Sequence, residues 1–481
     1  MPYDLAALDR IEQRFVRRGT SLFVETYNMD TGAILDSFEF TNAPQAMPSE
    51  VRSVAQRRLL DIVSPVSGAG IKRGATLKSC WQGKMTTVAT SAADHTSTYY
   101  RTLEAHTDRI RIGILNPVAA ILTNVKVNIG TSDTMPGLNT SLAGSTTTTG
   151  GILSGGTQVA SAAFDVAAGV SVDAPGLTWS PWIDISTIDR IDGGTLPLIR
   201  IRVEIPGATN ANRPALSVAK SRIGWETPAN VGGRVMKCRS DAVLGATTPG
   251  AGGSTTYAND TMPIIVEYMP RVGQGLTSVH FGDSITEGVD SDIEGYSWPY
   301  MARERVSTLA TPVEICNLAV ASTTTTEFRA RAEQLLPLLT PELVICAVFT
   351  PNGITAPNFT DTGNARLMYR NIQAIKAACA AVNATFVGWS GVPMLSTPPD
   401  TATGYKDLNP AGAASLNNYM AAVLSASPVI NSYAAVSGTA DADGQMRLTV
   451  GAAAGNLHMT SAGHQLASVP FEAFLRSNLP R

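Results

Sequence analysis

The sequence predicts a multidomain protein with an α/β domain at its C-terminus and β-rich segments before it. After about residue 262, short runs that are apolar on both faces alternate with segments of helical periodicity. This is typical of an open parallel sheet with helices on both sides. Before about residue 240, apolar and polar residues alternate along the runs, which is typical of half-buried antiparallel strands. A length of 481 residues also exceeds what one domain usually holds.

These patterns divide the chain into four expected segments. They are a small α+β unit over 1–70, an all-β sandwich or jelly roll over 71–240, a connecting segment over 241–274, and the three-layer α/β domain over 275–481. The last segment is expected to hold a five-stranded parallel sheet.

The small unit is expected to combine helices with a hairpin. Apolar residues at helical spacing predict a helix over Leu5–Val16, and Asn28–Gly32 between two apolar runs predicts a hairpin. Pro48 in a first turn predicts a second helix that ends at Ile62. The unit is either a structural appendage or a segment for attachment or oligomerisation.

In the β module, alternating runs predict strands at 109–115, 125–129, 182–185 and 198–205. A stretch rich in Gly, Ser and Thr over 131–156 predicts a long surface loop or flap. Modules of this kind often bind carbohydrate through exposed aromatic rings. Trp179 and Trp182 are therefore candidate carbohydrate contacts, and packing in or beside the sheet is the alternative for both.

In the α/β domain, predicted strands and helices alternate. We expect strands at 277–281, 313–316, 343–349, 385–389 and 429–433, and helices at 297–309, 327–339, 364–382, 411–426 and 461–477. Active groups in such a sheet collect at the carboxyl ends of the strands. Ser284 comes directly after the first strand, at such an end.

Charge and cysteine content limit the classes of partner and cofactor. A net charge of −3 without a long basic block argues against nucleic-acid binding. The five cysteines are scattered and lack CxxC spacing, so we expect neither a disulfide framework nor a metal site. Cys316 and Cys346 lie in apolar runs and are expected to be small buried side chains.

We expect neither a Sec signal peptide nor a membrane segment. The N-terminus has no apolar core region, and no window approaches about 18 uncharged apolar residues. The protein is therefore expected to be made in the cytoplasm and to act without a membrane.

The serine of Gly282-Asp283-Ser284 falls between a strand and a helix. Its hydroxyl would point out of the sheet beside free backbone N–H groups. Acyl transfer needs this combination of an exposed nucleophile and donors for a developing oxyanion. The alternative role is that of a serine that caps the helix. Three more turns fall at strand ends or before the last helix, at 317–323, 350–353 and 455–464.

Together, these four blocks resemble the SGNH/GDSL hydrolases, a family of esterases, lipases and carbohydrate deacetylases. The resemblance covers roughly 275–479 and implies a flavodoxin-like α/β fold without a metal or organic cofactor. It implies that Ser284 is the nucleophile, that His458 is the base, and that Asn352 donates to the oxyanion. The backbone N–H groups of Ser284 and Ser322 would complete the oxyanion hole.

The chain departs from the family pattern at three positions. Ser322 stands where the family has glycine, and serine tolerates a positive φ poorly. Thr350 stands where the family usually has glycine, and Gly455 replaces the acid of the triad. Asp441 and Asp443 precede the last block by a plausible loop and are candidates for orienting His458. A backbone carbonyl could do the same.

The expected function is that of a serine esterase that removes short acyl groups, most plausibly acetyl groups from a carbohydrate. The alternative is a binding or structural protein whose hydrolase fold has lost most or all of its activity, as the departures suggest. Expected partners are an acylated carbohydrate or a small ester, and a homo-oligomer is an open possibility. The segment order is similar to that of a phage tail protein of the virion, but a cytoplasmic bacterial esterase fits the same facts.

Overall fold

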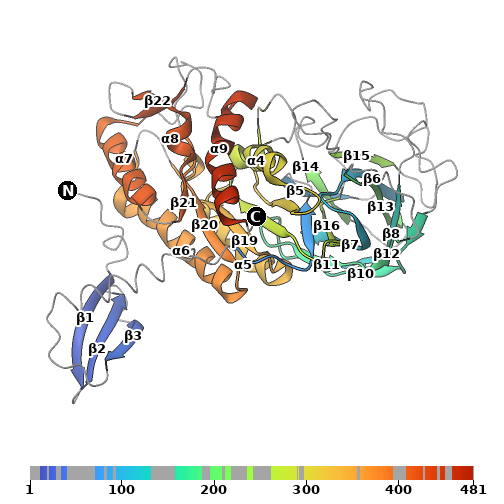
Figure 1. The fold of residues 1–481 in the computed structure, drawn as a ribbon, viewed down its shortest axis with the longest axis horizontal. Coiled ribbons are helices and arrows are strands. Elements are labelled where there is room, and N and C mark those ends of the chain that lie inside the picture. Colours follow the sequence, from blue (N-terminus) through green and yellow to red (C-terminus); the bar gives the residue numbers. More distant parts are fainter. Residues whose placement is uncertain are drawn as a thin grey trace.

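The fold is described from a computed structural model. It covers residues 11–18, 21–28, 34–40, 71–80, 84–89, 94–131, 158–186, 196–207, 212–217, 236–241, 262–289, 291, 297–354, 358–393, 408–425, 428–440, 445–449 and 458–479. Figure 1 shows the fold, with the α/β domain in yellow to red and the β-rich part in blue to green.

The described strands of the small unit form an antiparallel sheet in the order β1-β2-β3. They are β1 (Ile11–Arg18), β2 (Ser21–Asn28) and β3 (Ile34–Phe40). The predicted hairpin is present as the β2–β3 pair. The helix predicted over Leu5–Val16 is wrong from residue 11 onward, because pairing with β2 supplies the backbone hydrogen bonds and overrides the helical spacing. The second predicted helix lies outside the described residues.

The β module contains two larger antiparallel sheets and a ribbon. One sheet has the order β10-β8-β13-β6-β15, with β9 on β8, and the other has the order β11-β7-β16-β4, with β12 on β7. The first comprises β6 (His95–Thr102), β8 (Leu122–Thr131), β9 (Gln158–Ala160), β10 (Phe164–Val166), β13 (Leu198–Ile205) and β15 (Met236–Asp241). The second comprises β4 (Leu77–Cys80), β7 (Thr107–Asn116), β11 (Gly176–Trp179), β12 (Ile183–Asp184) and β16 (Ile264–Pro270). The ribbon pairs β5 (Lys84–Ala89) with β14 (Asn212–Ser217).

Strand β16 corrects the predicted connecting segment over 241–274. It lies between β7 and β4 inside an antiparallel sheet, and six of its seven residues are buried. A strand covered on both faces shows no alternation of apolar and polar residues, so its consecutive apolar residues did not reveal it. The predicted loop over 131–156 lies outside the described residues apart from its first residue.

The α/β domain is built on a five-stranded parallel sheet in the order β18-β17-β19-β20-β21. The strands are β17 (Leu276–Phe281), β18 (Val313–Asn317), β19 (Leu343–Ala347), β20 (Thr385–Trp389) and β21 (Val429–Ile430). The second strand in sequence lies outside the first, which is the flavodoxin-like order 2-1-3-4-5. All residues of β17, β18 and β19 are buried, as expected for a sheet covered on both faces.

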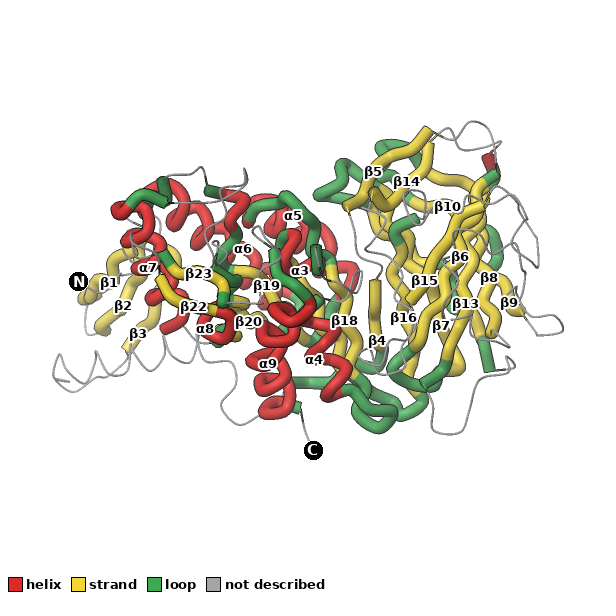
Figure 2. The backbone as a smooth tube through the Cα atoms, turned by 90° about the horizontal axis from the view of Figure 1, so that it is seen from above, coloured by secondary structure: helices red, strands yellow, loops and turns green. Residues whose placement is uncertain are grey.

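Helices cover both faces of this sheet. They are α4 (Trp298–Val306), α5 (Thr325–Leu339), α6 (Arg366–Ala381), α7 (Pro410–Ser425), α8 (Ser432–Val436) and α9 (Ser461–Asn478). In Figure 2 the pair α4 and α9 lies on one side of the strands, and the pair α5 and α6 lies on the other. The predicted fold class is confirmed, and most boundaries agree within two or three residues.

The end of the last predicted strand is wrong. The strand stops at Ile430, and the short helix α8 replaces its second half. Asn431 causes the change because its side chain accepts the Ala434 N–H at 3.0 Å and so caps α8. An unpredicted hairpin follows, with β22 (Ser437–Ala440) and β23 (Met446–Leu448).

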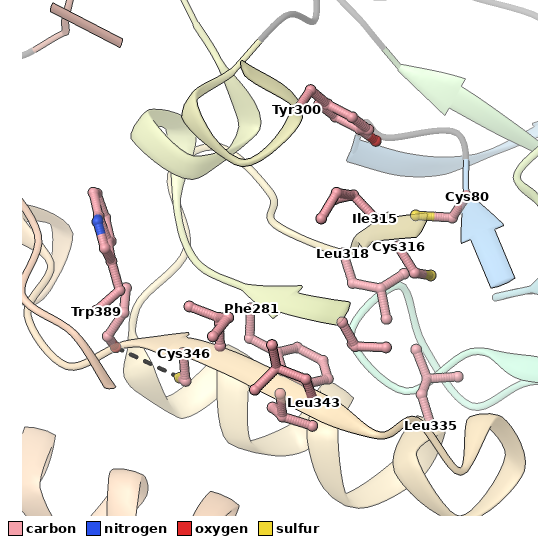
Figure 3. Close-up of a cluster of buried hydrophobic side chains, with 14 of the residues drawn as sticks. Cys80, Phe281, Tyr300, Ile315, Cys316, Leu318, Leu335, Leu343, Cys346 and Trp389 are labelled. Carbon is pink, nitrogen blue, oxygen red and sulfur yellow. Dashed lines mark hydrogen bonds between the residues drawn. The ribbon is translucent and has the colours of Figure 1, made fainter. Parts of the chain in front are cut away.

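Buried contacts join the β module to the α/β domain. The backbone N–H of Lys78 donates to the Thr277 hydroxyl at 3.0 Å, and the Cys80 thiol donates to the Asn317 carbonyl at 3.0 Å. Figure 3 shows Cys80 of β4 beside Cys316 of β18, within one continuous apolar cluster. Cys316 and Cys346 are buried free thiols, as predicted.

A buried ionic cluster lies at the same junction. Glu314 of β18 accepts the Tyr268 hydroxyl at 2.7 Å and pairs with Arg101 of β6 at 3.3 Å. Arg303 of α4 pairs with Glu314 at 3.5 Å and with Glu104, which follows β6, at 3.4 Å. Each of these charged side chains is at most 1% exposed. Because an unpaired buried charge is costly, the cluster holds the two parts together.

Candidate active site

Ser284 occupies the turn between β17 and the short helix α3 (Ser284–Glu287). Gly282 allows the tight turn, because a Cβ there would collide with the Thr286 side chain. The Asp283 carboxylate caps α3 by accepting the Ile285 N–H at 3.0 Å. The capping residue is therefore Asp283, and Ser284 is the first residue of the helix, at the carboxyl end of the first strand of the sheet.

His458 reaches Ser284 from the far end of the domain. Its Nε2 lies 2.9 Å from the Ser284 Oγ, although the two residues are 174 positions apart. Thr460, two residues after His458, is the N-cap of α9, and its hydroxyl accepts the Gly463 N–H at 3.2 Å. The hydroxyls of Ser291 and Ser461 lie 3.1 Å apart and connect the two segments a second time. A neutral imidazole at this distance can accept the serine proton.

Asn352 and Ser322 lie on two neighbouring turns. Asn352 is in the 3-10 turn Pro351–Gly353 after β19, and its Nδ2 donates to the Thr323 carbonyl at 2.9 Å. Ser322 follows β18 and adopts a φ of 64°, in the left-handed region. The positive φ expected at the family's glycine position therefore occurs here on a residue with a Cβ.

Several hydrogen bonds fix the loop that contains Ser322. The Asn317 side chain donates to the Thr286 carbonyl at 2.8 Å and accepts the Ala319 N–H at 3.1 Å. The Val320 N–H donates to the Gly282 carbonyl at 3.0 Å. The loop over 317–323 is thus tied to the turn that carries Ser284.

The part of the chain that carries Ser284 and His458 matches a known protein family. Residues 280–466 match the GDSL-like Lipase/Acylhydrolase family. The C-terminal part of this chain is a GDSL-like lipase/acylhydrolase domain. No curated protein matched the sequence.

Solved structures match the same part of the chain. A GDSL-like lipase from Bacteroides thetaiotaomicron has 19% identity and a TM-score of 0.31, with 42% of this chain and 89% of that chain covered. The lipase/acylhydrolase from Enterococcus faecalis has 14% identity and a TM-score of 0.31, covering 43% and 97%. A variant of an acetyl xylan esterase from Geobacillus stearothermophilus has 12% identity and a TM-score of 0.32, covering 43% and 97%.

Two residues of the acylhydrolase domain that sequence reasoning missed are Asp283 and Thr350. The Thr350 hydroxyl donates to the Asp283 carboxylate at 2.5 Å and accepts the Asn352 N–H at 3.3 Å. Burial raises the pKa of Asp283, and the Thr350 hydroxyl, the Ile285 N–H and the charge of His458 oppose this shift. The signal in the sequence was the hydroxyl at the usual glycine position, which can reach a carboxylate in the neighbouring turn.

The two candidates for orienting His458, Asp441 and Asp443, lie outside the described residues, as does Gly455. Their roles stay predictions.

The two other histidines of the domain are core residues. His280 is fully buried on β17, with its Nε2 2.9 Å from the Ser278 Oγ and its ring edge-on to Trp298 and Phe471. Burial lowers the pKa of His280 to about 3. His464 is fully buried on α9. Both are therefore assigned structural roles in the core.

The tryptophans of the β module stack on arginine. The Arg111 guanidinium lies 4.6 Å from the Trp179 ring centre and 4.7 Å from that of Trp182, and Arg109 lies 5.8 Å from the Trp182 ring centre. Arg111 also pairs with the buried Glu267 at 2.5 Å. This arrangement favours packing over carbohydrate contact, because guanidinium groups already cover the indole faces.

Among the described residues, no group of three or more His, Cys, Asp or Glu side chains could hold a metal ion. No described helix combines the length and apolar character needed to cross a membrane.

Proposed function

We propose that this protein is a serine esterase that hydrolyses short acyl esters, with Ser284 as the nucleophile and His458 as the general base. The observation that carries the proposal is the 2.9 Å contact between the His458 Nε2 and the Ser284 Oγ. A nucleophile within hydrogen-bonding reach of a base is the signature of covalent acyl transfer.

In the first half of the reaction, the Ser284 Oγ attacks the ester carbonyl and His458 takes its proton. The negative charge that develops on the carbonyl oxygen is stabilised by the N–H groups of Ser284 and Ser322 and by the Asn352 amide. Asn352 uses one amide hydrogen on the Thr323 carbonyl, which leaves the second for the oxyanion. His458 then protonates the leaving alcohol.

In the second half, His458 takes a proton from water as the water oxygen attacks the acyl carbonyl, and it then returns this proton to the Ser284 Oγ as the bond to the acyl group breaks and the carboxylic acid leaves. The imidazolium formed in both halves carries a positive charge close to the buried Asp283 carboxylate, with which it interacts electrostatically.

The finer proposal concerns the substrate. We propose an acetyl ester on a carbohydrate, because a β module is joined to the acylhydrolase domain through buried contacts at the Cys80 thiol and the Glu314 carboxylate. The test is release of acetate from a panel of acetylated polysaccharides, measured by mass spectrometry, with Ser284→Ala as the blank.

A second candidate is a glycan-binding or structural protein with little or no activity. Two departures from the family pattern favour it, namely the serine in place of glycine at position 322 and the glycine in place of the acid at position 455. An unsupported histidine costs on the order of 10⁴ in kcat in other serine hydrolases.

A serine-reactive fluorophosphonate probe separates the two candidates. The esterase should be labelled at Ser284 and should hydrolyse p-nitrophenyl acetate, and Ser284→Ala should lose both properties. Labelling that persists in Ser284→Ala, or a wild-type protein inert to both probe and ester, would falsify the esterase proposal.

A further inference from the structure

The left-handed conformation of Ser322 needs support from its surroundings. Its φ of 64° is a region where a Cβ crowds the backbone, and few residues other than glycine adopt it. Such a conformation persists only where neighbouring contacts fix the chain on both sides. The residues that fix this conformation therefore also position the Ser322 N–H, which is a proposed donor of the oxyanion hole.

Glu287 fixes the chain on the N-terminal side of Ser322. Its carboxylate accepts the Ala321 N–H at 2.5 Å, across 34 positions. Glu287 is the last residue of α3, three positions after Ser284, and its side chain is fully buried. One short helix thus carries both the nucleophile and a hydrogen-bond acceptor for the oxyanion loop.

Asn352 and Thr323 fix the chain on the other side. The Asn352 amide holds the Thr323 carbonyl at 2.9 Å, and the Thr323 hydroxyl donates back to the Val320 carbonyl at 2.5 Å. Residue 322 therefore lies between two segments that hydrogen bonds hold in place, and its φ is positive.

A second buried charged side chain holds the same loop. Arg331 of α5 is 1% exposed and donates from Nη1 to the Leu318 carbonyl of the same loop at 2.7 Å. Burial lowers the pKa of Arg331 to about 10, and the charges of Asp173, Glu327 and Glu287 oppose that shift. Two opposite charges therefore hold the loop at two points, one through a carbonyl and one through an N–H.

We propose that Glu287 is a positioning residue that keeps Ser322 in the left-handed conformation required of an oxyanion donor, and so compensates for the absence of glycine at this position. The inference rests on the proposed esterase function. It predicts that the effects of substitutions at residues 287 and 322 are coupled. Glycine populates positive φ readily, so a glycine at position 322 should depend less on the Glu287 contact than serine does.

The test is a double-mutant cycle between residues 287 and 322, read in kcat and KM for p-nitrophenyl acetate. Glu287→Ala should lower kcat by about 10-fold to 10²-fold with KM nearly unchanged, since loss of a whole oxyanion donor costs about 10² to 10³. In the Ser322→Gly background the same change should cost at least roughly threefold less. Glu287→Gln, which retains an acceptor oxygen, should recover part of the rate.

The matched control is Glu342→Ala. Glu342 also accepts a backbone N–H, that of Thr277 at 2.8 Å, but at the opposite end of β17. Its loss should leave kcat per folded molecule unchanged. Folding of every variant is checked by thermal unfolding, and rates are normalised to the folded fraction.

A purely structural role for Glu287 predicts equal losses in both backgrounds, and that result overturns the inference. If Glu287→Ala does not fold, the cycle is run with Glu287→Gln and judged by the same criterion. A wild-type protein without esterase activity or probe labelling refutes the proposed function itself. An active wild type with additive variants refutes only the role of Glu287.

Discussion

The Thr350 hydroxyl donates a 2.5 Å hydrogen bond to the Asp283 carboxylate, and both side chains are buried at the edge of the sheet. The contact joins the turn after the first strand to the turn after the third. It also explains how the domain uses a threonine at a position where the family usually has glycine. The same hydroxyl accepts the Asn352 N–H, so one side chain links the residue before Ser284 to the proposed oxyanion donor Asn352.

Thr350→Val should destabilise the protein by about 1.5–3 kcal/mol, because the buried Asp283 carboxylate loses a hydrogen bond. The esterase rate should also fall, since the Asn352 turn loses an acceptor. Urea unfolding and ester hydrolysis measure the two effects. Thr308→Val is the control, because its hydroxyl lies in an exposed turn 2.7 Å from that of Thr311. Equal stability of the two variants would contradict the prediction.

His458→Gln should lower kcat on the order of 10⁴-fold or more, because Ser284 loses its base. Fluorophosphonate labelling should slow in parallel, whereas thermal stability should change little. A variant that is labelled at the wild-type rate would show that the 2.9 Å contact has no role in activating the serine.

Asn352→Ala should lower kcat by about 10² to 10³, with a smaller effect on KM, because a donor to the transition-state oxyanion is lost. Asn352→Asp should be at least as slow, since it brings a negative charge toward the oxyanion. Asn358→Ala is the control, as the side-chain oxygen of this exposed amide accepts a hydrogen bond from the Asn409 amide at 2.9 Å. An increase in KM alone would instead indicate a role in ground-state binding.

Glu314→Gln should lower the free energy of unfolding by about 3–5 kcal/mol, because Arg101 and Arg303 lose their shared buried carboxylate. Asp108→Asn removes the exposed pair with Arg271 and should cost less than about 1 kcal/mol. Chemical unfolding at pH 7 checks both values. Similar losses in the two variants would argue against the junction as a point of coupling between the domains.

The pH dependence of stability should include a contribution from His280. Its folded-state pKa is about 3, below the roughly 6.5 of an unfolded chain, because burial disfavours the charged ring. Between these values the unfolded state binds the extra proton. Its stabilising contribution is therefore present above pH 6.5 and falls by about 1.4 kcal/mol per pH unit as the pH decreases.

His280→Phe removes this titration, and the apolar rings of Trp298 and Phe471 can pack against the new side chain. Urea unfolding of wild type and variant at pH 7, 6, 5 and 4.5 measures the difference in slope. Parallel curves would contradict the assignment of a neutral buried histidine.

The local pattern of apolar and polar residues was sufficient to predict much of the secondary structure of the acylhydrolase domain. Strand β20 has its predicted bounds and α9 starts at its predicted residue, because a buried strand or an amphipathic helix encodes its own hydrophobic period. The turn at Ser284 was also predicted, since Gly282 and Gly288 mark it in the sequence.

Prediction from the local pattern failed where an element pairs or packs with segments from other parts of the chain. The strand β1 was predicted as helix because its pairing with β2 is not visible in its own spacing. The strand β16 was assigned to a connecting segment because it is covered on both faces by other elements. Asn431 caps α8, so the predicted strand stops before it. The spacing of apolar residues gives no sign that a helix cap forms there.

The sequence by itself determined the order of the elements, the parallel sheet and the residue types of the candidate site, because these depend on composition and period within short windows. Only the tertiary structure decided which groups meet: His458 with Ser284, Thr350 with Asp283, and Glu287 with Ala321. These contacts span 34 to 174 positions, and such pairs form only when the sheet brings the ends of its strands together.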